Sequence, residues 1–137
     1  MSNSRHRRPL LSAHHAKRDR YAGILKQHTE SHSKVTAVVL ATPDGFEVAA
    51  IHYLGEPRSA QFAAMASSLI AVARAAGREV GHEGCDGLIV ESPSGKLLIR
   101  PVGKSDGLLL CMVLAPGMLL GAALWAADEI GKAISSI

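Results

Sequence analysis

The sequence predicts a mixed α/β (α+β) domain in which a five-stranded, mainly antiparallel sheet packs with three helices in the order α-β-β-α-β-β-β-α. Three observations support this fold class. Short apolar runs alternate with turn residues at hairpin spacing, which favours antiparallel pairing of successive strands. Two longer alanine-rich segments have helical periodicity. The chain of 137 residues has the length of one domain.

The N-terminal quarter of the chain differs in charge from the rest. Residues 1–34 hold eight Lys or Arg and two acidic residues, whereas the remainder holds seven and ten. Residues 1–12 are polar and lack apolar periodicity, so we expect a disordered basic arm followed by a single domain over residues 13–137. A first helix is expected over residues 13–33. Its narrow apolar stripe consists of Tyr21, Ile24, Leu25 and His28.

The first two strands are predicted to form a hairpin. Residues 35–41 are apolar on both faces apart from Thr36, which is typical of a central strand. Residues 43–45 are Pro-Asp-Gly and supply the turn. Residues 46–52 then return as the partner strand.

A long alanine-rich helix is predicted from Ser59 to about Ala76, with Gly77 as the residue that ends it. Two apolar faces on this helix indicate packing on the sheet and against a second surface, and the alternative is one wide buried stripe. The bulky face carries Phe62, Met65, Leu69 and Val72. The flat face carries Ala63, Ala66, Ile70, Ala73 and Gly77.

Three further strands and a last helix complete the predicted domain. The strands cover residues 88–91, 96–100 and 108–115, and the helix runs from Met118 to about Ser136, with Leu119 and Trp125 on its inner side. Residues 108–127 are uncharged over a membrane-spanning length. Because Ala-Pro-Gly at 115–117 divides that stretch into a strand and a helix, we expect no membrane insertion.

No motif in the chain indicates enzymatic chemistry. Residues 103–105 are Gly-Lys-Ser, but the preceding glycine of a phosphate-binding loop is missing and the segment lies between two strands. His28 and His32 have metal-ligand spacing without a completing ligand. Cys85 and Asp86 lie near His82 but lack an orienting group. We therefore expect no catalytic residues, no metal and no cofactor.

The cysteines and the basic arm bear on the compartment and on partners. Cys85 and Cys111 are expected to be free thiols, and no apolar signal segment follows the first arginines, so we expect a cytoplasmic protein. The arm could contact phosphates of nucleic acid or anionic lipid. Only Tyr21 supplies an aromatic ring there, so base stacking is not indicated and a solvated arm is favoured.

Four segments of the chain resemble the Roadblock/dynein-light-chain domain family. They are the first hairpin (residues 38–49), the alanine-rich helix (62–69), the second hairpin (88–103) and the last strand with the helix start (108–121). The family often has Asn-Leu-Gly at the last site. This chain has Leu-Leu-Gly at 119–121, so the polar residue is missing.

The resemblance implies a fold related to profilin and longin, with sheet order 2-1-5-4-3. It also implies a homodimer in which the third strands pair edge to edge and the middle helices pack together. An apolar edge strand is a liability in a monomer, and a two-fold interface needs only one patch on each subunit. The interface predicted in this chain comprises Ala63, Ala66, Ile70, Ala73, Leu88, Ile89, Val90 and Glu91.

The resemblance further implies a function. Bacterial members of the family are typically partners of small Ras-like GTPases, as activators or as platforms, and not every member supplies an arginine finger. We expect a homodimeric regulator of this kind, with Arg58, Arg74 and Arg78 as candidate partner contacts of unassigned role. Two alternatives stay open: a profilin-like module that senses a small ligand, and a nucleic-acid-binding protein that uses the basic arm.

Overall fold

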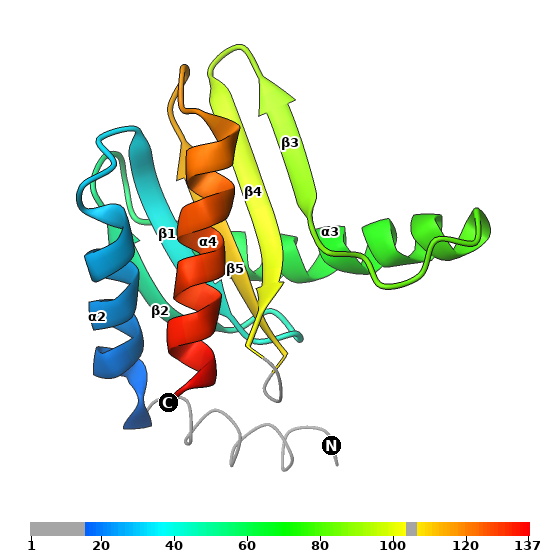
Figure 1. The fold of residues 1–137 in the computed structure, drawn as a ribbon, viewed down its shortest axis with the longest axis horizontal. Helices are drawn as coiled ribbons and strands as arrows, with labels where there is room; N and C mark the ends of the chain where they lie inside the picture. Colours follow the sequence, from blue (N-terminus) through cyan, green and yellow to red (C-terminus); the bar gives the residue numbers. More distant parts are fainter. Residues whose placement is uncertain (1–15, 104–106) are drawn as a thin grey trace.

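The computed structural model of the chain describes residues 16–103 and 107–137, so the expected arm at residues 1–12 lies outside the described residues. The predicted order of helices and strands is confirmed in the described part (Figure 1). The elements are α2 (Arg18–Thr29), β1 (Val35–Ala41), β2 (Glu47–His52), α3 (Ser59–Glu79), β3 (Leu88–Ser92), β4 (Gly95–Val102), β5 (Leu108–Leu114) and α4 (Leu120–Ser135).

The five strands form one sheet in the order β2-β1-β5-β4-β3, as the family resemblance implied. Every neighbouring pair is antiparallel. β1 and β5 lie in the middle and are buried along almost their whole length, which explains why both sequences are nearly continuous apolar runs. β2 and β3 are the two edges of the sheet.

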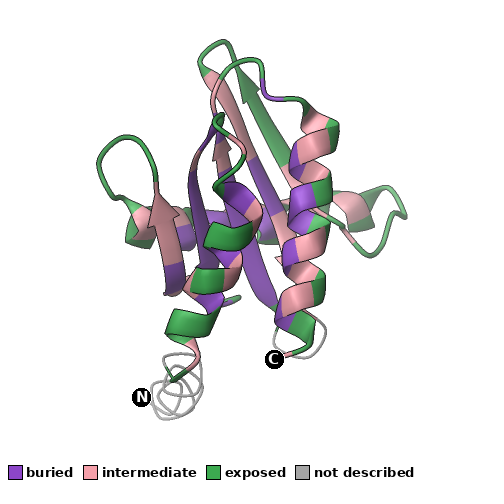
Figure 2. Cartoon of the chain, turned by 60° about the vertical axis from the view of Figure 1, so that its left-hand side comes forward, coloured by how far each residue is buried: buried purple, intermediate pink, exposed green. Residues whose placement is uncertain are grey.

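Two helices, α2 and α4, cover one face of this sheet (Figure 1). Tyr21 and Leu25 of α2 and Ile130 of α4 lie in a single core cluster with large side chains of the strands, such as Leu110. Thr29 at the end of α2 donates its hydroxyl to the Leu25 carbonyl at 2.7 Å. Figure 2 shows the buried residues concentrated in the central strands and on the sheet-facing sides of these helices.

The last helix departs from the prediction on one side. Leu119 and Trp125, expected inside, are 76% and 64% exposed. The helix begins at Leu120, so Leu119 precedes the first turn, and the buried side is built from small residues and isoleucine. The uncharged stretch at 108–127 resolves into β5 and α4 with the turn between them, as expected.

Of the described helices, α3 (Ser59–Glu79) packs on the opposite face and crosses it (Figure 1). It ends at Glu79, three residues later than predicted, and Gly81 rather than Gly77 adopts a left-handed φ, of 75°. Glycine is required at position 77 for a different reason, which is the close approach of the following loop. The His82 amide donates to the Gly77 carbonyl at 2.7 Å, and a Cβ at Gly77 would lie 2.6 Å from the His82 carbonyl oxygen. The chain thus folds back tightly over the end of α3.

Candidate interaction surface

The two apolar faces of α3 are exchanged relative to the prediction. Ala63, Ala66 and Ile70 were expected to lie uncovered without a partner, but all three are buried against the chain's own sheet. They pack with residues such as Val39 and Ile99. Small side chains let the helix axis approach the strands closely, so the flat face is the one that fits the sheet. The expectation that this face is free to meet another subunit is wrong.

The bulky face of α3 is the one that the chain leaves uncovered. Met65 is 51% exposed and Val72 is 67% exposed, and Phe62 and Leu69 are half-buried between them and the sheet. These four residues recur every three or four positions, so they form one stripe along the helix. Apolar exposure of this extent on one helix stripe is uncommon in a monomer.

The sheet next to this stripe is also uncovered. Val90, Leu97 and Val113 lie side by side on β3, β4 and β5. They share the face that α3 packs on, because Ile99 and Cys111, two residues away on the same strands, belong to the α3 cluster. None of the three is buried, and they line a shallow hollow of about 280 Å³.

Helix stripe and strand residues together make one continuous area, since Phe62, Met65 and Leu69 border the same small crevice as Leu97 and Val113. We call it the α3–sheet apolar surface. It consists of Phe62, Met65, Leu69, Val72, Val90, Leu97 and Val113.

The edge strand β3 adjoins this surface. Its only neighbour in the sheet is β4, so its outer backbone groups have no strand partner in the described chain. Ile89 and Val90 are each 38% exposed, and Glu91 is exposed. Leu88, by contrast, is half-buried and packs against the α3 cluster. An exposed apolar edge of this kind is a ready template for pairing with another strand.

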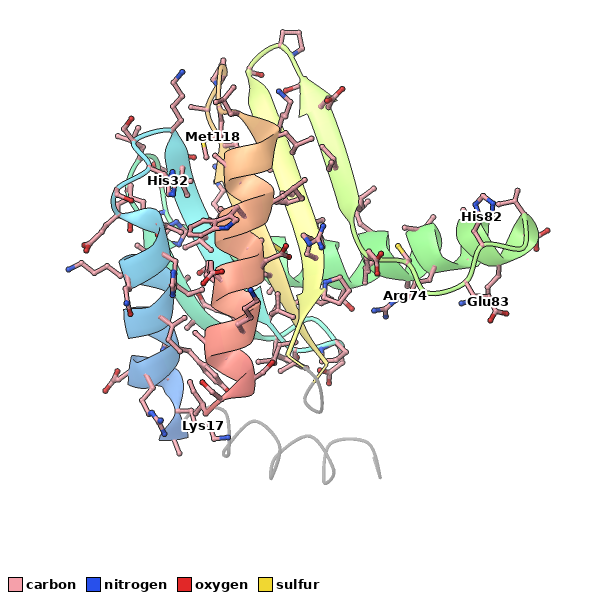
Figure 3. The ribbon with its side chains drawn as sticks, in the orientation of Figure 1. Lys17, His32, Arg74, His82, Glu83 and Met118 are labelled. Atoms are coloured by element: carbon pink, nitrogen blue, oxygen red, sulfur yellow. The ribbon has the colours of Figure 1, made fainter. Side chains whose placement is uncertain are left out.

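The three candidate arginines lie at the two ends of α3. Arg58 precedes the first turn of the helix and its guanidinium lies 3.8 Å from the Glu56 carboxylate, with both side chains well exposed. Arg74 and Arg78 lie one turn apart near the other end and line an open hollow of about 540 Å³. Figure 3 shows Arg74 and Glu83 on the same side of the helix, and His82 on the opposite side.

Sequence reasoning missed one arginine in this hollow. Arg100 of β4 also lines it, together with Glu83, Gly84, Cys85, Asp86 and Pro101. The Arg100 guanidinium donates to Asp128 of α4 at 3.4 Å. No local pattern marks Arg100, because the loop after α3 and the pairing of β3 with β4 bring it beside the helix end.

The histidines, acids and cysteines of the described residues form no metal cluster, and the two thiols differ in exposure. No group of three His, Cys, Asp or Glu in the described ranges could hold a metal ion. His28 lies in α2, whereas His32 follows the helix end, so the two do not share a helical face. Both cysteines are free. Burial raises the pKa of the Cys111 thiol to about 12, so it stays protonated at neutral pH. Lys104 and Ser105 of the Gly-Lys-Ser segment lie outside the described residues.

Comparison with known proteins decides the family. The family model described as Roadblock/LC7 domain matches residues 21–114, more than half of the chain. This chain belongs to the Roadblock/LC7 family. The match spans the sheet and α3, which are the elements that form the α3–sheet apolar surface. No curated protein sequence matches the chain.

Solved structures agree with this fold. The gliding protein MglB of Thermus thermophilus is 17% identical, with a TM-score of 0.75 over 88% of this chain and 90% of that one. A Roadblock/LC7 domain of Streptomyces avermitilis is 23% identical, with a TM-score of 0.69 over 84% and 92%. Profilin II of Acanthamoeba castellanii is 16% identical, with a TM-score of 0.57 over 85% and 97%. The implied relation to profilin is therefore confirmed at the level of the fold.

Proposed function

We propose that this protein is a homodimeric, non-catalytic regulator or platform that binds a small Ras-like GTPase and modulates its nucleotide cycle. The observation that carries the proposal is the α3–sheet apolar surface beside the unpaired edge of β3. Membership of the Roadblock/LC7 family supplies the class of partner.

A second copy of the chain is the occupant that we propose for the uncovered surface. In a two-fold arrangement with antiparallel β3 strands, each α3 would extend behind the sheet of the other subunit, because α3 projects beyond β3 (Figure 1). The bulky stripe of one α3 would then cover Val90 and Leu97 of the other copy and meet the stripe of the second α3. One patch, used twice, would close both the apolar surface and the sheet edge.

The exposure of α3 supports this placement. The helix is long and apolar enough to cross a membrane by length and composition alone, and only 17% of that window is buried in the chain. Its flat side is part of the domain core, so one side of the helix is already packed on the sheet. The exposed apolar side of α3 therefore favours packing against a protein partner. For such a regulator we propose a cytoplasmic location.

The ligand-sensing alternative has less support. Between α3 and the sheet the structure leaves about 10 Å³ of space, which is below the volume of a small molecule and is lined by apolar side chains. A profilin-like fold alone therefore does not indicate a ligand site here. The nucleic-acid alternative rests on the arm, outside the described residues.

GTP hydrolysis tests the proposal directly. The full chain is mixed with a purified, GTP-loaded small Ras-like GTPase of the same organism, and phosphate release and complex formation are measured. We expect a complex on gel filtration, with hydrolysis accelerated if the chain is an activator and unchanged if it is a platform. If none of the small Ras-like GTPases of the organism formed a complex with the chain, the proposed function would be rejected.

Val72→Lys sharpens that test. This change should weaken both the dimer and the effect on the GTPase, if the GTPase recognises the dimer. Val80→Lys is the matched control, because Val80 is as exposed as Val72, at 67%, but lies beyond the last residue of α3. If Val72→Lys lost the dimer but bound the GTPase as well as Val80→Lys does, GTPase binding would not depend on dimerisation.

A further inference from the structure

We propose that the hollow at the end of α3 binds an acidic segment of a partner polypeptide through Arg74 and Arg78. The inference deepens the proposed function and rests on it, because it gives the regulator a docking point for its partner. The hollow lies between the last turns of α3, the loop at residues 83–86 and the Arg100 end of β4.

In the single chain, the two helix arginines are available for a partner. Arg74 and Arg78 have no ion pair within the described residues, although the carboxylates of Glu83 and Asp86 line the same hollow. Both are exposed, and they stand on successive turns of the helix. The planar guanidinium is the side-chain group best suited to bidentate recognition of a carboxylate.

The third arginine of the hollow, Arg100, is paired with a residue on the opposite face of the sheet. Arg100 is half-buried and is held by Asp128 at 3.4 Å. A partner carboxylate would meet Arg74 and Arg78 first, because these two are free of such a contact. The hollow is about 540 Å³ and open, which suits a peptide segment better than a single small anion.

The mixed charge of the lining favours polypeptide over other polyanions. A phosphate backbone is repelled by Glu83 and Asp86 and offers these two carboxylates no hydrogen-bond donor in return. Among the described residues no aromatic side chain lines the hollow, so none of them would stack on a base there. A polypeptide can present a carboxylate to Arg74 and a backbone amide or basic group to Glu83 at the same time.

A titration of the full chain with a capped peptide tests the inference. The probe is Gly-Ser-Asp-Glu-Asp-Ser-Gly, and its neutral match replaces Asp and Glu by Asn and Gln. Nitrogen-15 NMR follows the backbone amides of Gly84, Cys85 and Asp86 and the side-chain Nε groups of Arg74 and Arg78. We expect saturable shifts at these positions with the acidic peptide and none with the neutral one.

Two variants make the titration site-specific. The double change Arg74→Gln with Arg78→Gln should weaken binding of the acidic peptide about tenfold or more, since two charge-assisted contacts are lost. Arg58→Gln, just before the start of the same helix, should leave binding unchanged. All three positions are exposed, and circular dichroism before each titration confirms that the variants are folded.

The contrary results are clear. Equal affinity in the double variant would overturn the inference, as would shifts confined to residues 1–34, which would place binding on the basic arm. Inorganic phosphate or a single-stranded oligonucleotide that shifts the same signals more strongly than the peptide would also overturn it. Because no GTPase is present, failure here leaves the hydrolysis and complex assays to decide the proposed function separately.

Discussion

The two faces of the sheet are covered in different ways. The first face is covered by α2 and α4, and large residues such as Leu25, Leu110 and Ile130 are fully buried there. Within the described residues, the second face has only α3. This helix buries alanines and one isoleucine on the sheet, with Phe62 and Leu69 half-buried beside them, and leaves Leu97 and Val113 partly open. The difference indicates that the first face holds the fold together and the second is built to be completed by another molecule.

Side-chain size explains this division. Each buried methylene stabilises by about 0.8 kcal/mol, so an alanine face contributes much less than a leucine face of equal length. Close packing of small residues still fixes where the helix lies. The second face is therefore well defined in position but only partly closed, which is suitable for an interface.

Leu110→Ala tests the closed face and should have the largest effect. We expect a loss of about 3 kcal/mol in the free energy of unfolding, because a buried leucine is replaced by a cavity. Urea unfolding at fixed protein concentration measures it. Leu119→Ala, the same change at an exposed site, should stay within about 0.5 kcal/mol. Similar losses in both variants would contradict the assignment of the core.

Ala66→Leu tests the contact between α3 and the sheet. Ala66 is buried between helix and strands, so the added atoms should cost about 1–3 kcal/mol through overpacking. Ala75→Leu on the exposed side of the same helix is the control and should be nearly neutral. If Ala66→Leu were neutral on folding and changed only association, the flat face would be an interface after all.

Element order and strand pairing were predictable from the sequence because they depend on local signals. The Pro-Asp-Gly turn at 43–45 and the apolar runs of β1 and β5 specify hairpins without reference to distant residues. The family resemblance supplied the strand order. The edge position of β3 followed from that order and is confirmed.

The choice between the faces of α3 was not predictable in the same way. Both faces are apolar, and hydrophobicity alone favours burial of the bulky residues such as Phe62 and Met65. Close approach to the sheet favours the small ones, Ala63 and Ala66, and this second effect decides the packing. Arg100 was missed because its place beside Arg74 depends on tertiary structure.

Glycine substitutions sharpen the account of where α3 ends. Gly77→Ala should destabilise by about 1 kcal/mol or more, because its Cβ would meet the His82 carbonyl at 2.6 Å. Gly23→Ala in α2 has no atom within 4 Å of the new Cβ and should stabilise by about 0.5–1 kcal/mol through helix propensity. Thermal unfolding distinguishes the two signs. If both changes stabilised the protein, the loop after α3 would have moved to accommodate the new Cβ at little cost in free energy.

Thiol labelling should have the smallest effect on the fold. Cys85 is partly exposed beside the arginine hollow and should react with a maleimide in the native protein with little change in stability. Cys111 should react only after unfolding, since it is buried and its pKa is raised to about 12. Raising the pH from 7 to 9 should not expose Cys111 to labelling. Native labelling of both cysteines would contradict the packing of α3 on β5.

Solution mass by light scattering tests the central claim most directly. At micromolar concentration the intact protein should have twice the 14.4 kDa mass of one chain. Val72→Lys on the bulky face of α3 should shift it to a single chain, and Val80→Lys should not. A single-chain mass for the intact protein would contradict the account, and so would a Val72→Lys variant that remains as dimeric as Val80→Lys.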